Sequence, residues 1–109
     1  MAWVDVAARR DLAPSAGLEI EVGGKALLLV EAEGRIHAVD AVCPHHAAWF
    51  TDGRVEGGRI FCPRHMGAFD LETGRQLAGP PCPSLGVYPV RCEAGRILVG
   101  INPLPAARA

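Results

Sequence analysis

The chain has 109 residues, a formal net charge of −1 and 50% hydrophobic residues, with 13 glycines and 9 prolines. This length suits one domain, and the near-neutral charge argues against nucleic acid as a partner, because phosphate binding needs a basic surface. The longest apolar run, 26–30, is far shorter than a membrane span, and the N-terminus does not resemble a signal peptide, so we expect a cytoplasmic protein without membrane contact.

Apolar and polar residues alternate with a period of two along most of the chain, which predicts β-strands joined by glycine-rich turns. The predicted strands, in chain order, are Trp3–Val6, Leu18–Val22, Lys25–Val30, Arg35–Val39, Gly86–Arg91 and Arg96–Ile101. Only Val6–Leu12 and Ala47–Phe50 could hold a helical turn, and the tail 102–109 is expected to fray. Short strands of this kind are typical of an all-β fold, so we predict a small antiparallel β-sandwich or barrel.

A short internal repeat carries the chemistry. Cys43-Pro44-His45-His46 matches Cys62-Pro63-Arg64-His65, and each segment offers one thiolate and one imidazole within four residues. Two such loops can converge and place two sulfur and two nitrogen ligands around one metal centre. The proline in each loop restricts the backbone and so helps to fix the ligand geometry.

These residues have three other interpretations. Paired disulfides suit small secreted proteins, and no secretion signal is evident here. A structural zinc site accepts two cysteines and two histidines, although the familiar zinc finger does not mix the two in each arm. Chance clustering of buried thiols and surface histidines is the third, and two matching arms argue against it.

The pattern C-x-H, sixteen residues, C-x-x-H resembles the signature of Rieske proteins. In that family the cysteines hold one iron of a [2Fe–2S] cluster and the histidines hold the other. The resemblance therefore implies that Cys43 and Cys62 bind the inner iron, and that His45 and His65 bind the outer one. It also implies a Rieske fold, with a cluster-binding subdomain of two loops inserted between strands at about 42–83 of a single domain spanning 1–101.

The resemblance extends from about Trp3 to Ile101 and is strongest to the ferredoxin components of aromatic-ring dioxygenase systems. Phe69–Gly74 is similar to the family's strand and turn after the second loop, and Gly79-Pro80-Pro81 to its cluster-shielding proline loop. These relatives imply a one-electron carrier, itself not an enzyme. It would take electrons from a flavin-containing NAD(P)H-dependent ferredoxin reductase and deliver them to a terminal oxygenase, as a monomer that docks transiently.

Respiratory Rieske proteins differ from this sequence at four positions. Their loop disulfide uses positions occupied here by Ala48 and Arg64, and their cluster-bonding serine and tyrosine are replaced by Gly67 and Phe69. Fewer hydrogen bonds to sulfur stabilise the reduced cluster less, so we expect a potential near the bottom of the Rieske range of roughly −150 to +300 mV.

The two remaining cysteines, Cys82 and Cys92, are expected to be small buried hydrophobic residues on strands, without a ligand role. Two alternatives to the ferredoxin remain open. The chain could be the Rieske small subunit of a reductase such as nitrite reductase, or, more remotely, a structural zinc module.

Overall fold

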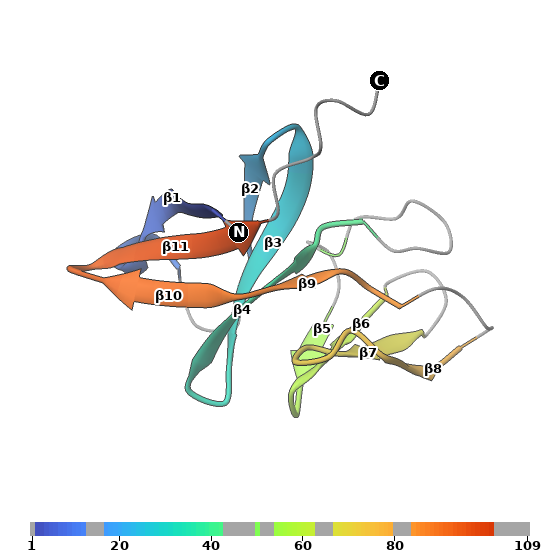
Figure 1. The fold of residues 1–109 in the computed structure, drawn as a ribbon. Helices are drawn as coiled ribbons and strands as arrows, with labels where there is room; N and C mark the ends of the chain where they lie inside the picture. Colours follow the sequence, from blue (N-terminus) through green and yellow to red (C-terminus); the bar gives the residue numbers. More distant parts are fainter. Residues whose placement is uncertain are drawn as a thin grey trace, which may run out of the picture.

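The computed structural model describes residues 2–12, 17–42, 50, 54–62, 67–79 and 84–101. In this part of the chain the secondary structure is almost entirely β, which confirms the predicted fold class (Figure 1). The strands are β1 (Ala2–Ala8), β2 (Leu18–Val22), β3 (Lys25–Ala32), β4 (Arg35–Asp40), β5 (Arg54–Glu56), β6 (Arg59–Phe61), β7 (Ala68–Asp70), β8 (Gln76–Ala78), β9 (Val87–Tyr88), β10 (Val90–Glu93) and β11 (Arg96–Ile101), and one 3-10 helix spans Arg9–Asp11. No helix among these residues is long and apolar enough to cross a membrane.

The strands form three antiparallel sheets. Their orders are β1-β11-β10, β2-β3-β4-β9 and β5-β6-β7-β8. We call these the outer, central and distal sheets. The distal sheet lies within residues 54–78 and is formed by three-residue strands, of which β5 and β6 are joined by the two-residue turn Gly57-Gly58.

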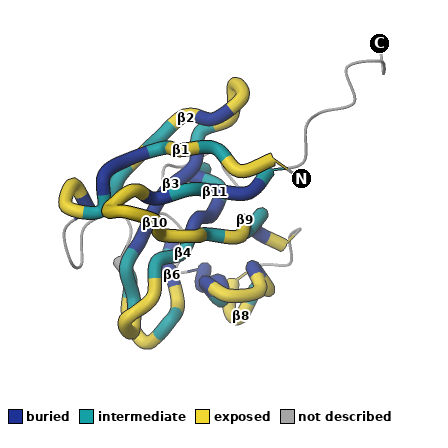
Figure 2. Tube along the Cα trace, turned by 60° about the vertical axis from the view of Figure 1, so that its left-hand side comes forward, coloured by how far each residue is buried: buried dark blue, intermediate teal, exposed yellow. Residues whose placement is uncertain are grey.

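The central sheet is covered on both faces, and β3 shows this most clearly. Leu27 and Leu29 belong to the apolar cluster that packs the central sheet against β1 and β11 of the outer sheet. Leu28 and Val30 point the other way, into a second cluster with residues of the distal sheet. Successive strand residues face opposite sides of a sheet, so a strand with two buried faces must be apolar throughout. This explains the uninterrupted apolar run at 26–30, and the dark, buried course of β3 in Figure 2.

Two sequence predictions need correction in detail. The predicted strand Gly86–Arg91 is divided at Pro89: β9 pairs with β4 of the central sheet, whereas β10 pairs with β11 of the outer sheet. Proline has no N–H to donate, so it marks the point at which the chain changes sheets. The possible helical turn at Val6–Leu12 is confined to Arg9–Asp11, because Ala7 and Ala8 extend β1 by pairing with β11.

Candidate metal centre

Cys62 is the one predicted ligand that lies among the described residues. It follows β6 and shares a strand face with Ile60, so its side chain enters the apolar cluster between the central and distal sheets. It is 3% exposed and forms no disulfide. The Cys62 N–H donates to the Gly67 carbonyl oxygen at 2.8 Å, which joins the two ends of the segment 63–66. Cys43, His45 and His65 lie outside the described residues.

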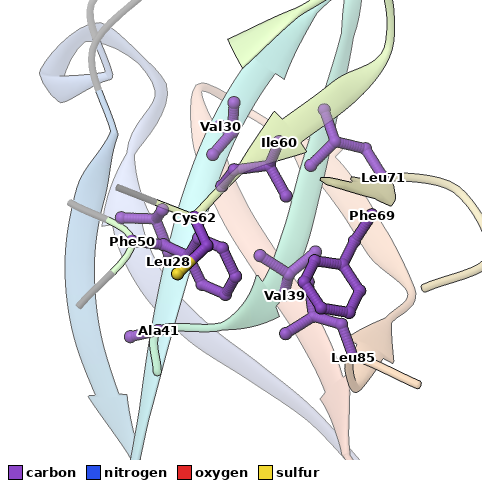
Figure 3. Close-up of a cluster of buried hydrophobic side chains, with 10 residues drawn as sticks. All are labelled: Leu28, Val30, Val39, Ala41, Phe50, Ile60, Cys62, Phe69, Leu71 and Leu85. Atoms are coloured by element: carbon purple, nitrogen blue, oxygen red, sulfur yellow. The ribbon is translucent and has the colours of Figure 1, made fainter. Parts of the chain in front are cut away.

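The residues on either side of the first predicted ligand segment belong to the same apolar cluster as Cys62. Ala41 comes directly after β4, and its carbonyl oxygen accepts a hydrogen bond from the Phe50 N–H at 2.8 Å. Both residues are about 1% exposed or less, and both contribute to the cluster that contains Cys62 (Figure 3). The backbone around the segment 42–49 and the backbone around the segment 63–66 are therefore anchored in one place.

Gly79, the first residue of the predicted proline loop Gly79-Pro80-Pro81, lies against Gly67, which follows the second ligand segment; Pro80 and Pro81 lie outside the described residues. Gly79 has a φ of +104°, and a Cβ atom on it would lie 2.9 Å from the Gly67 Cα. Only glycine tolerates both this conformation and so close an approach. The chain after residues 80–83 is also fixed, because the Leu85 N–H donates to the Gly74 carbonyl oxygen at 2.8 Å and the Leu85 side chain is buried in the same cluster.

The surroundings of Cys62 suit a soft metal ligand. The other members of its cluster are aliphatic or aromatic, and Figure 3 shows the sulfur beside Phe50, Leu28 and Ala41. Thiolates are preferred by iron–sulfur clusters and zinc, and an apolar shell excludes water from such a centre. Within the described residues no group of three or more metal-binding side chains gathers. The surroundings of Cys62 therefore fit a thiolate ligand, either of an iron–sulfur cluster or of zinc.

A polar network missed by the sequence analysis ties the chain on either side of this region. Asp40 ends β4, and its carboxylate accepts hydrogen bonds from the Tyr88 hydroxyl at 2.6 Å and from the Gly86 N–H at 3.0 Å. Lys25 donates to the Tyr88 oxygen at 3.0 Å. That bond raises the pKa of Lys25, and burial raises the pKa of Tyr88. Lys25 is therefore charged and Tyr88 protonated at neutral pH.

The prediction that Cys92 is buried is wrong. We expected a buried residue, but Cys92 is an exposed free thiol on β10. β10 is an edge strand of the outer sheet, and Cys92 borders an open groove that His37 and Tyr88 also line. Among the described strands, β10 pairs only with β11, so its other edge stays open and Cys92 is exposed there. Cys82 lies outside the described residues.

Comparison with known proteins identifies the class. The model of the Rieske [2Fe–2S] domain matches residues 2–89, and the chain belongs to that family. It is 40% identical over 100 residues to the ferredoxin component of a naphthalene 1,2-dioxygenase system from Pseudomonas aeruginosa, covering 92% of this chain and 96% of the relative.

Two solved structures share the fold closely. The ferredoxin of carbazole 1,9a-dioxygenase from Nocardioides aromaticivorans IC177 superimposes with a TM-score of 0.85 at 28% identity, covering 94% of this chain and 100% of the other. A protein described as the small subunit of an NADH-dependent nitrite reductase from Mycobacterium tuberculosis gives a TM-score of 0.80 at 30% identity, covering 90% of this chain and 93% of the other. One neighbour is a dioxygenase ferredoxin, the setting predicted first, and the other is described as a nitrite reductase small subunit, the first of the two alternatives.

Proposed function

We propose that the chain is a Rieske ferredoxin that carries single electrons from a flavin-containing NAD(P)H-dependent reductase to a terminal aromatic-ring dioxygenase. It catalyses no reaction of its own. The observation that carries this proposal is the placement of Cys62, buried at the point where both ligand segments are anchored. The length match to dioxygenase ferredoxin components supports it, because both proteins are covered almost completely.

We assign Cys43 and Cys62 as thiolate ligands and His45 and His65 as imidazole ligands of one [2Fe–2S] cluster. When bound, the cluster supplies a centre that accepts and releases one electron. The residues around Cys62 hold its thiolate in a dry, rigid setting. Rigid ligands lower the structural rearrangement that accompanies a change of charge.

The exposed free thiol of Cys92 suits a reducing compartment, which supports a cytoplasmic location. Docking to the two partners is proposed to be transient, with the chain itself monomeric, as is usual for redox encounters. Arginines between Arg54 and Arg96 would offer a mildly basic contact surface to an acidic partner.

Absorption and EPR spectra of the purified protein test the cluster assignment. We expect a brown-red protein that bleaches with dithionite, and a rhombic EPR signal that appears only after reduction. A colourless protein that holds zinc would refute the proposal. Cys62→Ser should abolish the spectrum, whereas the matched variant Cys92→Ser should keep it. A Rieske spectrum that survives in His45→Cys or His65→Ala would show that the histidine assignment is wrong.

The nitrite reductase small subunit is the second candidate, favoured by the M. tuberculosis structure. Native mass measurement after mild purification from the source cells separates the two. A ferredoxin should be found free, whereas a permanent subunit should remain in a larger complex. Reduction by NADH through the flavoprotein reductase of a naphthalene dioxygenase system, followed by loss of colour, should occur only for the ferredoxin.

A further inference from the structure

The ladder between β4 and β9 stops after two residue pairs, and the two chains then separate. The pairs join 38–39 of β4 to 87–88 of β9, whereas β10 pairs with β11 of the outer sheet instead of continuing along β4. In Figure 1 β10 and the start of β4 diverge on the side of the β3–β4 turn. The separation leaves an open groove of about 510 Å³, a size typical of ligand-binding clefts, with residues of 35–37 on one wall and residues of 89–92 on the other.

The β10 wall of this groove presents backbone groups that no described strand uses. The Gly100 N–H donates to the Pro89 carbonyl oxygen at 2.9 Å, so the backbone of Pro89 faces β11. Along a strand, the backbone groups of successive residues point to alternate edges. Val90 and Cys92 therefore turn their N–H and C=O groups away from β11 and toward the groove, which both residues line.

The β4 wall is built in the same way. The Asp40 N–H donates to the Gly86 carbonyl oxygen at 2.9 Å, on the edge of β4 that faces β9. Because backbone groups alternate, Ala38 and Ile36 direct theirs to the same edge. Ala38 is paired with Tyr88, but Ile36 lies beyond the last pair of the ladder. As far as the described residues show, the groove therefore has an unpaired strand edge on each side.

The side chains that line the groove are mostly apolar and carry no net charge. Ile36 and Val90 pack against the apolar cluster between the central and outer sheets, and Leu71 belongs to the other apolar cluster. Arg35 and Glu72 also line the groove and neutralise each other in an ion pair of 3.1 Å.

The titratable rings in the groove add no charge at neutral pH. Burial lowers the pKa of His37 and raises the pKa of Tyr88, so both rings are neutral. A charged occupant would lose hydration in the groove without meeting a net opposite charge. An uncharged segment in the extended conformation loses little, because its backbone donors and acceptors match those of a strand edge.

We propose that this groove is a docking site for an extended, uncharged peptide segment of a partner protein, which pairs with the open edge of β10 and packs apolar side chains against Ile36 and Val90. The open edge selects an extended backbone, and the apolar wall selects apolar residues at every second position. The docking site is independent of the cluster assignment, because none of the groove residues is a predicted ligand. It adds a protein-binding surface to the proposed electron transfer.

The probe is the capped peptide acetyl-Thr-Val-Thr-Val-Thr-amide, and its matched control is the same peptide with every amide N-methylated. Hydrogen exchange of the full chain as purified is followed by mass spectrometry of the fragments that contain Ile36, Val90 and Cys92. With peptide at about ten times its dissociation constant, the amides that face the groove should exchange roughly tenfold more slowly, because they exchange in free protein only. No slowing in a titration carried to the solubility limit of the peptide would overturn the inference.

Two variants at one position test the edge itself. Cys92→Pro removes an N–H that faces the groove and none that pairs with β11, a position where a strand tolerates proline. It should abolish the slowing at Val90 and Ile36. Cys92→Ala loses the thiol but keeps the N–H, so it should respond to the peptide as the wild type does. Equal slowing in both variants would refute pairing with the edge of β10.

Other occupants give different results in the same measurement. Slowing by the N-methylated peptide that equals slowing by the probe would show that the groove binds apolar side chains alone, as a small apolar ligand would. Slowing that appears without peptide as the protein concentration rises would show that a second copy of the chain occupies the edge. Either result overturns the inference. If Cys92→Pro does not fold, the two peptides on the wild-type protein decide the question.

Discussion

Phe50 meets Phe69 edge to face, with ring centroids 5.9 Å apart and ring planes at 86°. Phe50 follows the first ligand segment, and Phe69 lies on β7 after the second, so this contact joins the chain behind one segment to the chain behind the other. Both side chains are essentially inaccessible to solvent. The arrangement is the favoured one for two aromatic rings, because the positive edge of one approaches the negative face of the other.

Phe69→Tyr should raise the reduction potential. The resemblance implies that high-potential Rieske proteins have at the matching position a tyrosine whose hydroxyl bonds to a cluster sulfur, and that a hydroxyl here can do the same. One net hydrogen bond of about 1 kcal/mol in favour of the reduced state corresponds to about 40 mV for a one-electron couple. Potentiometric titration followed by EPR measures the shift. A potential that stays at the wild-type value would contradict the predicted role of Phe69 in keeping the potential low.

His37 should make the protein sensitive to acid. It lies on β4, and burial lowers its pKa below the usual histidine value of 6.5. The nearby Arg35 guanidinium adds to this shift, while Glu72 and the backbone of Ala32 and Leu71 oppose it. The unfolded chain then binds this proton at higher pH than the native protein does. The contribution of neutral His37 to stability is therefore complete above pH 6.5 and is lost as the pH falls through the lowered native value.

Urea unfolding near pH 7.5 and near pH 5.5 measures this dependence. The loss of stability between the two conditions should be smaller in His37→Gln than in the wild type. Arg35→Gln is the companion variant, because removal of the guanidinium should raise the pKa of His37 and so reduce the acid sensitivity without removing the imidazole. An equal loss of stability in wild type and His37→Gln would assign the acid sensitivity to other groups.

Gly74→Ala should destabilise the protein far more than Gly24→Ala. Both glycines have positive φ, +77° and +82°, so each alanine pays about 1–2 kcal/mol for the left-handed conformation. A Cβ on Gly74 would also overlap the Leu85 carbonyl oxygen, whereas one on Gly24 meets nothing within 4 Å. The additional overlap should bring the total cost of Gly74→Ala to about 3 kcal/mol or more. Thermal unfolding compares the two, and equal melting temperatures would contradict this account.

Leu28→Ala and Leu27→Ala should separate the global stability of the protein from its retention of the iron–sulfur cluster. The two residues are neighbours on β3, both about 1% exposed or less, and each substitution should cost about 2–5 kcal/mol. Leu28 packs in the cluster with Cys62, whereas Leu27 packs against the outer sheet. Iron release under native conditions should therefore be faster in Leu28→Ala than in Leu27→Ala, even when the two variants lose the same amount of stability. Equal rates at equal stability would indicate that the two apolar clusters act as one.

The parts of the fold that a local sequence pattern encodes were predicted from the sequence. The parts that were not predicted depend on contacts between residues far apart in the chain. Alternation over Leu18–Val22 with a Gly23-Gly24 turn predicts the β2–β3 hairpin, which is confirmed. Three-residue strands such as β5 and β8 are too short for periodicity to reveal them. The division at Pro89 arises because β9 pairs with β4 and β10 pairs with β11, and both partner strands lie far away in the sequence or in another sheet.

The candidate site also combines features that the sequence pattern reveals with features that depend on contacts between distant residues. The ligand types and spacing of Cys43, His45, Cys62 and His65 are visible in sequence, since they resemble a family signature, and the ligand assignment stays a prediction. The bond between Asp40 and Tyr88 spans 48 positions, and no periodic pattern in sequence encodes a pair so far apart. An aspartate at the end of a strand is otherwise an ordinary surface residue.

Because Asp40 and Gly86 are adjacent in space, the intervening residues 41–85 begin and end at the same place in the fold. The two flanking residues are hydrogen-bonded to each other, so a short turn could replace this segment without parting β4 from β9. The remainder would keep its apolar cluster between the outer and central sheets but would expose Leu28, Val30 and Val39 to water. Such an open apolar face promotes aggregation. Residues 41–85 are thus easy to delete in the gene. The rest of the chain nevertheless depends on them to cover its apolar face and to avoid aggregation.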